Sequence, residues 1–186
     1  MRLALLMFAA VTLCACGPQR ESATTGCART ATHQVTWTNP DAPDSIQARA
    51  DGPSCLQAVV TFVARNADGD PLWAFASTYY DMTAGGAAPE GAAPVSAADM
   101  DRFLNAWAQV TQMRSSELPE WRSDAATLTE SATTFAYDTP FDRETYEVLR
   151  ARNLPMICYA AAAEATQCLI VDPASHAPAM MVAYGP

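Results

Sequence analysis

The sequence has 186 residues, of which half are hydrophobic and 17% are charged, a balance typical of a globular chain rather than a disordered one. Its 20 acidic and 11 basic side chains give a formal net charge of −9, and so acidic a surface repels nucleic acid and anionic headgroups. Every basic residue is an arginine. Because the chain has no lysine, pyridoxal enzymes, lysine-dependent aldolases and P-loop nucleotide hydrolases are excluded.

The N-terminus has the pattern of an export signal. A charged start, Met1-Arg2, precedes the apolar residues 3–12 and the tetrapeptide Leu13-Cys14-Ala15-Cys16. As a helix the apolar segment would span about 20 Å, whereas a membrane-spanning helix needs about 20 apolar residues. The segment is therefore too short to span a membrane, and an ordinary signal cleaved after Ala15 is one interpretation.

The same tetrapeptide resembles the lipobox of bacterial lipoproteins, in which a leucine, a variable residue and a small residue precede the cysteine that receives the lipid. The resemblance implies that Cys16 is diacylated through its sulfur and becomes the mature N-terminus. Two or more acyl chains hold a protein at a membrane effectively permanently. Residue 17 is glycine rather than aspartate, which resembles lipoproteins sorted to the outer membrane. We therefore expect attachment to the outer membrane, with the domain facing the periplasm.

The composition along the chain predicts three parts. Residues 1–15 form the signal peptide, residues 16–31 form the lipidated cysteine and a flexible tether, and residues 32–186 form one globular domain. The tether is polar and rich in Ser, Thr and Ala. Removal of the signal leaves roughly 170 residues, which is enough for one domain with a substantial core.

Four cysteines remain once Cys14 and Cys16 are assigned to processing, and an even number in an exported domain predicts disulfides. Three pairings are possible, and closeness in the sequence favours Cys27–Cys55 together with Cys158–Cys168. The second pair brackets a predicted β-hairpin, in which cross-strand neighbours lie at bridging distance. The alternative is free catalytic or metal-binding thiols, which no C-x-x-C spacing supports.

Hydrophobic alternation and turn residues predict four strands in the first part of the domain, at 33–38, 45–50, 56–65 and 72–80. The Asp-Gly pair within residues 66–71 supplies the positive φ of a hairpin turn between the last two. A low-complexity loop follows at 83–95. Ser96 and Asp99 form a capping-box pattern before an apolar stripe, which predicts a helix from Ser96 to about Arg114.

In the second part, residues 131–137 alternate weakly and predict a strand. Thr139-Pro140 predicts the start of a second helix, which ends before Pro155. Three further strands are predicted at 156–162, 166–171 and 179–184. Short turns between neighbouring strands favour antiparallel pairing. The sequence therefore predicts an α+β fold, an antiparallel sheet of about seven to eight strands with two helices packed on one face.

Three groups of side chains contain residue types found in calcium sites, Ser–His nucleophilic sites or copper sites, but none has the spacing that such a site requires. The acidic turn at 66–70 lacks ligands required by a calcium-binding EF-hand. Ser175 and His176 are adjacent, which makes a direct contact between nucleophile and base geometrically unfavourable. His176 with Met180 and Met181 would suit copper, but consecutive methionines on a strand point to opposite faces. We expect turns and packing here, with no catalytic residue, no metal and no cofactor.

Tyr79 and Tyr80 lie beside the loop 83–95, and an aromatic pair next to such a loop is a candidate binding surface. The absence of catalytic spacing favours a non-catalytic, lipid-anchored binding or structural module of the cell envelope. Its partners would be the membrane, through the lipid, and another envelope protein, a glycan or a small ligand, but not nucleic acid. The alternative is an envelope-polymer hydrolase with a pair of carboxylates, because glycosidases need only two acids at a defined separation. Two facing acids in a cleft would favour the hydrolase.

Overall fold

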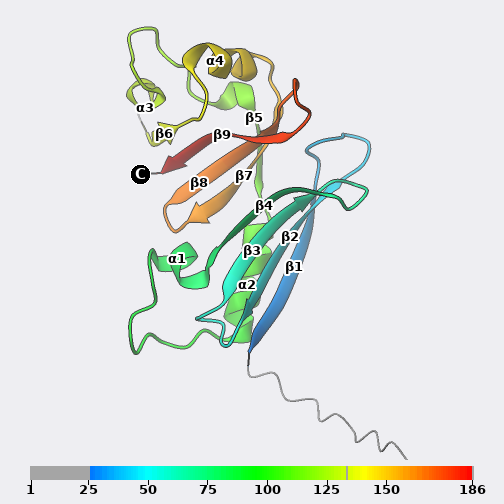
Figure 1. The fold of residues 1–186 in the computed structure, drawn as a ribbon, viewed down its shortest axis with the longest axis vertical. Coiled ribbons are helices and arrows are strands. Elements are labelled where there is room, and N and C mark those ends of the chain that lie inside the picture. Colours follow the sequence, from blue (N-terminus) through cyan, green and yellow to red (C-terminus); the bar gives the residue numbers. More distant parts are fainter. Residues whose placement is uncertain (1–25, 133, 186) are drawn as a thin grey trace, which may run out of the picture.

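The computed structural model describes residues 26–132 and 134–185. Within these residues, nine strands form two antiparallel sheets (Figure 1). The first sheet has the order β1 (Cys27–Val35), β2 (Asp44–Gly52), β3 (Val59–Arg65), β4 (Pro71–Thr78). The second has the order β5 (Thr111–Arg114), β7 (Pro155–Ala162), β8 (Ala165–Val171), β9 (Pro178–Gly185), β6 (Ala136–Asp138). The helices are α1 (Tyr79–Ala84), α2 (Ala97–Ala108), α3 (Leu128–Ser131) and α4 (Arg143–Ala151), with a 3-10 turn η1 (Ser115–Glu117).

The α+β class and the antiparallel pairing are confirmed, but the strands are divided between two sheets instead of forming one. After β4 the chain leaves the first sheet through α1, a long loop and α2, and β5 then pairs with β7. The expectation that both helices pack on one face was also wrong. α2 contacts β1 and β2, whereas α4 carries part of the core of the second sheet (Figure 1).

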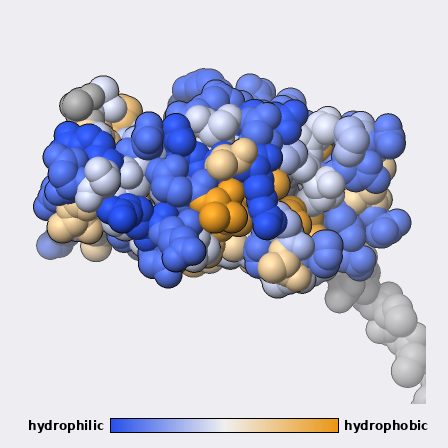
Figure 2. Space-filling model, turned by 90° about the horizontal axis from the view of Figure 1, so that it is seen from above, coloured by the Kyte–Doolittle hydropathy of each residue, from blue (hydrophilic) through white to orange (hydrophobic). Residues whose placement is uncertain are grey.

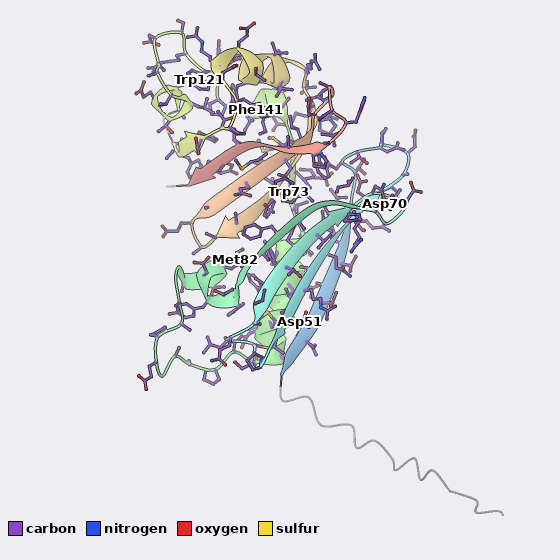
Figure 3. The ribbon with its side chains drawn as sticks, viewed as in Figure 1. Asp51, Asp70, Trp73, Met82, Trp121 and Phe141 are labelled. Carbon is purple, nitrogen blue, oxygen red and sulfur yellow. A yellow bond between two sulfur atoms is a disulfide. The ribbon has the colours of Figure 1, made fainter. Side chains whose placement is uncertain are left out.

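The inner face of the first sheet is covered by α2 and by the second sheet. Every second residue of β2 and β3 is buried, as expected for strands with one face in the core. Phe62 of β3 stacks on Tyr159 of β7, with ring centroids 4.4 Å apart. Trp73 of β4 lies where the two sheets meet and donates its indole N–H to the hydroxyl of Tyr159 at 2.9 Å (Figure 3). The two sheets therefore meet in one hydrophobic core, and a second core lies between the other face of the second sheet and α4.

The helix that starts after Ser96 is shorter than the sequence predicts. Ser96 and Asp99 form the expected capping box. However, α2 ends at Ala108, and residues from Thr111 onward lie in β5, where they pair with β7. The strand partner satisfies backbone groups that the helix would otherwise have used, so tertiary pairing overrides the helical pattern.

β4 ends earlier than predicted, and the two tyrosines that follow it are helical. The side chain of Thr78 accepts the backbone N–H of Asp81 at 3.1 Å and caps α1. Tyr79 and Tyr80 are therefore the first residues of a short helix rather than the end of a strand.

A strand and a helix boundary in the second half of the domain also differ from those predicted from the sequence. The strand expected at 131–137 is replaced by α3 and the three-residue strand β6. α4 starts after Asp142, whose carboxylate accepts the backbone N–H of Thr145 at 2.7 Å, rather than at Thr139-Pro140. The three-stranded meander at the end of the domain is confirmed as β7, β8 and β9.

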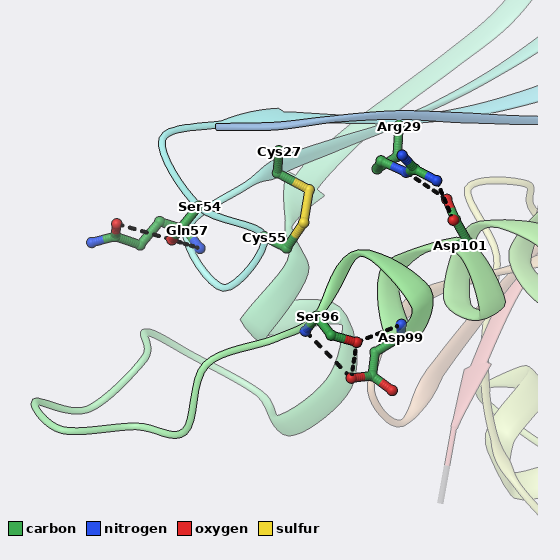
Figure 4. Close-up of a disulfide and its surroundings, with 8 residues drawn as sticks. All are labelled: Cys27, Arg29, Ser54, Cys55, Gln57, Ser96, Asp99 and Asp101. Atoms are coloured by element: carbon green, nitrogen blue, oxygen red, sulfur yellow. Dashed lines mark hydrogen bonds and ion pairs between the residues drawn. A yellow bond between two sulfur atoms is a disulfide. The ribbon is translucent and has the colours of Figure 1, made fainter. Parts of the chain in front are cut away.

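Both predicted disulfides are present, Cys27–Cys55 and Cys158–Cys168. Cys158 and Cys168 lie directly opposite each other in the register of β7 and β8. The loops they close have sequence separations of 28 and 10, for which a chain-entropy estimate gives a stabilisation of about 3.6 kcal/mol and about 2.7 kcal/mol, respectively. Figure 4 shows the first pair between the start of β1 and the turn after β2.

β1 begins at Cys27, so residues 27–31, which were expected in the tether, belong to the domain. The ion pair of Arg29 with Asp101 joins this strand to α2 (Figure 4). The signal peptide and the lipidated Cys16 predicted from the sequence lie outside the described residues. No helix among the described residues is long and apolar enough to cross a membrane.

Two buried tryptophans differ by one hydrogen bond. Trp107 donates its indole N–H to the carbonyl of Ala160 at 2.8 Å, whereas the indole N–H of Trp37 has no acceptor among the residues described. We expect Trp107→Phe to lower the free energy of unfolding by about 1 kcal/mol more than Trp37→Phe. Both changes remove the same ring area, but only the first breaks a hydrogen bond. Urea unfolding followed by circular dichroism measures both, and equal losses would contradict the expectation.

Candidate functional site

The tyrosines predicted as a binding surface lie on α1. Tyr79 is half-buried, and its ring meets that of Phe103 edge-on with centroids 5.1 Å apart. Tyr80 is also half-buried. A hollow of about 460 Å³ beside α1 is lined by residues that include Val59 and Asp81, but by neither tyrosine. The structure therefore places Tyr79 in the packing against α2 and brings neither ring to this hollow.

The loop between β8 and β9 is a hydrogen-bonded turn. Asp172 accepts the backbone N–H of Ala174 at 3.0 Å and the hydroxyl of Ser175 at 2.7 Å, and these contacts hold its pKa below the usual range. His176 has a φ of 56°, and its backbone N–H donates to the carbonyl of Asp172 at 2.8 Å. The Ser175 hydroxyl is thus committed to Asp172, which confirms the interpretation of this segment as a turn.

The other two groups of side chains are also explained by turn geometry and packing. Gly69 has a φ of 88° and donates its N–H to the carbonyl of Asn66 at 3.0 Å, which confirms the hairpin turn. Met180 and Met181 pack into different hydrophobic cores, as expected for opposite faces of a strand. In the part of the chain that the structure describes, no group of three or more His, Cys, Asp or Glu side chains is placed to hold a metal ion.

Hydrogen bonds stabilise the ionised form of many carboxylates. They hold the pKa below its usual range for six aspartates: Asp51, Asp81, Asp99, Asp101, Asp142 and Asp172. The main donor is the side chain of Arg29 for Asp101 and the backbone N–H of Thr145 for Asp142. A glycosidase general acid needs the opposite, a carboxyl whose pKa is raised. These six aspartates act as caps, turn acceptors and ion-pair partners.

A cluster of three aromatic rings at the edge of the second sheet is the strongest candidate for a binding surface. Tyr137 of β6 lies opposite Tyr184 of β9, with ring centroids 5.1 Å apart. Phe135, just before β6, lies 5.5 Å from Tyr184 and 6.4 Å from Tyr137. Phe135 is 45% exposed, one of three large hydrophobic residues exposed among those described. We call Phe135, Tyr137 and Tyr184 the aromatic shelf.

The strand register places the shelf beside two hollows. Tyr137, Tyr184, Thr166 and Ala160 form one row across β6, β9, β8 and β7. Hollows of about 250 Å³ and about 260 Å³ both have Ala160, Thr166 and Tyr184 in their walls, so they adjoin along this row. Because β6 is an edge strand, the sheet ends beside the shelf.

The two hollows combine aromatic and polar walls. One contains Phe135 and Glu164, and the other contains Trp107, Gln109 and Thr111. Aromatic faces provide contact area, and the carboxylate, amide and hydroxyl groups provide hydrogen-bond acceptors and donors. This combination suits a ligand that has apolar faces and many hydroxyl groups.

Tyr137 also borders a third hollow, of about 430 Å³, on the side of α3. Its wall contains Trp121, which lies near α3 and α4 (Figure 3), together with Thr129 and Asp138. Burial raises the pKa of Tyr137, and the neighbouring Tyr184 raises it further. The Tyr137 hydroxyl therefore stays protonated at neutral pH and remains a hydrogen-bond donor.

Reasoning from the sequence missed the shelf. The only local signal is the alternation of Phe135 and Tyr137 in the segment predicted as a strand. Tyr184 comes from the other end of the second half, and nothing in the sequence pairs β6 with β9.

The chain matches no protein-family model, and no curated protein and no solved structure shows significant similarity to it.

Proposed function

We propose that the protein is a non-catalytic binding module that a lipid on Cys16 anchors in the outer membrane, facing the periplasm, and that it holds a glycan of the cell envelope on the aromatic shelf. The lipobox resemblance supports the anchor. The two disulfides fit an exported protein, because such bonds form and persist in oxidising compartments.

The observation that carries the glycan proposal is the aromatic shelf beside hollows with polar walls. A pyranose ring has a face of C–H groups that stacks on an aromatic ring, while its hydroxyl groups bond to neighbouring polar side chains. Phe135 and Tyr184 offer such faces, and Thr166, Gln109 and Glu164 lie along the adjoining hollows.

The charge of the protein narrows the class of glycan. With a formal net charge of −9, the surface repels polyanions, so we propose an uncharged saccharide segment as the bound part. The glycan strands of peptidoglycan, built from N-acetylated hexosamines, provide such segments within reach of an anchored periplasmic domain.

The remaining surface supports a small polar contact more than a broad apolar protein interface. The face shown in Figure 2 is mainly hydrophilic, with one small central group of hydrophobic residues. Among the described residues the exposed large hydrophobics are Val59 on β3, Phe135 just before β6 and Val148 on α4. Protein interfaces usually need a larger contiguous patch.

We expect Phe135→Ala to weaken binding to isolated peptidoglycan sacculi about tenfold. Loss of one stacking ring removes about 1.4 kcal/mol of binding free energy. Val148→Ala is the matched control, because Val148 is 49% exposed on α4, outside the three hollows around the shelf. Sedimentation of the detergent-solubilised protein with increasing amounts of sacculi gives both dissociation constants. Equal retention of the two variants would overturn the glycan proposal.

A further inference from the structure

A fourth hollow, of about 470 Å³, lies where the loop between β1 and β2 meets β5 and η1. One wall contains Trp37, Thr38 and Pro40, and the other contains Gln112, Arg114 and Glu117. It shares no lining residue with the three hollows around the aromatic shelf. We call it the Trp37 cleft.

The loop wall of the cleft is fixed by a buried carboxylate. Asp44 is fully buried and accepts the backbone N–H groups of Trp37 at 3.1 Å and Thr38 at 2.6 Å, and the hydroxyl of Thr38 at 2.7 Å. Three charge-assisted hydrogen bonds hold the loop in one conformation. This wall is therefore formed before any ligand arrives.

The opposite wall is fixed by a buried serine. Ser115 donates its hydroxyl to the carbonyl of Leu149 at 2.9 Å and accepts the backbone N–H of Leu154 at 2.8 Å. The neighbouring Arg114 donates its backbone N–H to the carboxylate of Glu117 at 2.7 Å. A site with both walls preformed loses little free energy to ordering when a ligand binds.

Two residues of opposite charge, Arg114 and Glu117, line the cleft without forming an ion pair with each other. Five other arginines form ion pairs: Arg29, Arg49, Arg102, Arg122 and Arg150. Arg114 has no carboxylate within 4.0 Å among the described residues, and its guanidinium makes one long hydrogen bond of 3.5 Å to the carbonyl of Asn153. Glu117 uses one oxygen for the Arg114 backbone, and its carboxylate can accept further donors.

The accessible apolar residues of the cleft are Pro40, Met113 and Pro155, and Trp37 lies buried beside them. It is only 3% exposed, and its indole N–H is buried without an acceptor in the ranges described. An unpaired buried donor costs about 1–3 kcal/mol, and such a group in a folded protein calls for an explanation. The ring belongs to the wall that Asp44 fixes, so the ligand contacts are assigned to the accessible residues of the cleft.

We propose that the Trp37 cleft binds short peptides in their zwitterionic form. The terminal carboxylate pairs with Arg114, the terminal ammonium pairs with Glu117, and a side chain packs on Pro40 and Met113. The volume lies within the range of about 300–1,000 Å³ that is usual for small-molecule sites. This proposal is independent of the glycan proposal, because the two sites share no residue and bind different ligands.

Calorimetric titration of the detergent-solubilised full-length protein with alanyl-phenylalanine, and with its N-acetylated and C-amidated forms, tests the proposal. We expect the free dipeptide to bind at least about tenfold more tightly than either blocked form, because each block removes one charge-assisted contact. Failure of the free dipeptide to bind, or equal binding of all three forms, would overturn the proposal.

Two variants test which residue binds each end of the dipeptide. Arg114→Gln is expected to weaken binding of the free dipeptide about tenfold and to leave the C-amidated form unaffected. Glu117→Gln keeps an acceptor for the Arg114 backbone, so the wall is retained while the ammonium partner is lost. Arg102→Gln, on the exposed face of α2, is the matched control and leaves every affinity unchanged. A loss in the control equal to that in Arg114→Gln would show a general effect of charge and contradict the assignment.

The Phe135→Ala variant distinguishes a failure of this inference from a failure of the proposed function. It is expected to weaken retention on sacculi and to leave dipeptide binding unchanged, since Phe135 does not line the cleft. A dipeptide that binds wild type but not Phe135→Ala would place its site on the aromatic shelf and overturn the inference.

Discussion

Replacement of Cys16 by serine is expected to abolish the incorporation of labelled palmitate and to leave the protein soluble or as an unprocessed precursor. In the lipobox that Leu13-Cys14-Ala15-Cys16 resembles, the thiol of the last residue is the acceptor of the diacylglyceryl group. A serine hydroxyl does not replace it, and none of the described helices has the length and apolar character of a membrane span.

Cys14→Ser is the matched control, because it removes a thiol two residues away and leaves the acceptor in place. Metabolic labelling followed by fractionation of the membranes measures both variants. Equal labelling of wild type and Cys16→Ser would contradict the lipid anchor, and loss of labelling in Cys14→Ser alone would move the attachment to the other thiol.

Asp44→Ala is expected to lower the free energy of unfolding by about 3 kcal/mol or more. The buried carboxylate accepts three hydrogen bonds, and its removal leaves two backbone N–H groups and the Thr38 hydroxyl without their acceptor. The loop that carries Trp37 would lose its fixed conformation, so binding in the Trp37 cleft is expected to fall as well.

Asp41→Ala is the control for this change, since Asp41 lies in the same loop with an exposed side chain. Its effect on the free energy of unfolding is expected to stay within about 0.5 kcal/mol. Asp44→Asn keeps one acceptor oxygen and is expected to fall between the two. Urea unfolding followed by circular dichroism measures all three, and a loss in Asp44→Ala no larger than that in Asp41→Ala would show that Asp44 does not fix the loop.

Local features of the sequence predicted local structure well. The meander of β7, β8 and β9, the capping box of Ser96 and Asp99, and both disulfides depend on residues close in the chain or on neighbouring strands. The division into two sheets depends on the pairing of β5 with β7 and of β6 with β9. No hydrophobic pattern within a short window determines such distant partners, so one sheet was expected where two exist.

The candidate binding residues were missed for the same reason, because their neighbours come from distant parts of the chain. Tyr79 and Tyr80 are adjacent in the sequence and were visible as a pair, but a Thr78 cap turns them into a helix and Phe103 packs against Tyr79. The aromatic shelf gathers Phe135 and Tyr184 from distant segments. In the Trp37 cleft, Trp37 likewise faces residues far along the chain.

We propose above all that the protein binds peptidoglycan glycan without cleaving it. The most direct measurement is prolonged incubation of the purified protein with sacculi, in which the bound protein and the newly released soluble reducing ends are assayed in the same samples. We expect the protein to sediment with the sacculi, Phe135→Ala to stay largely in solution, and the amount of soluble fragments to equal that of sacculi alone. Release of soluble fragments by the wild-type protein would contradict this account and favour a hydrolase.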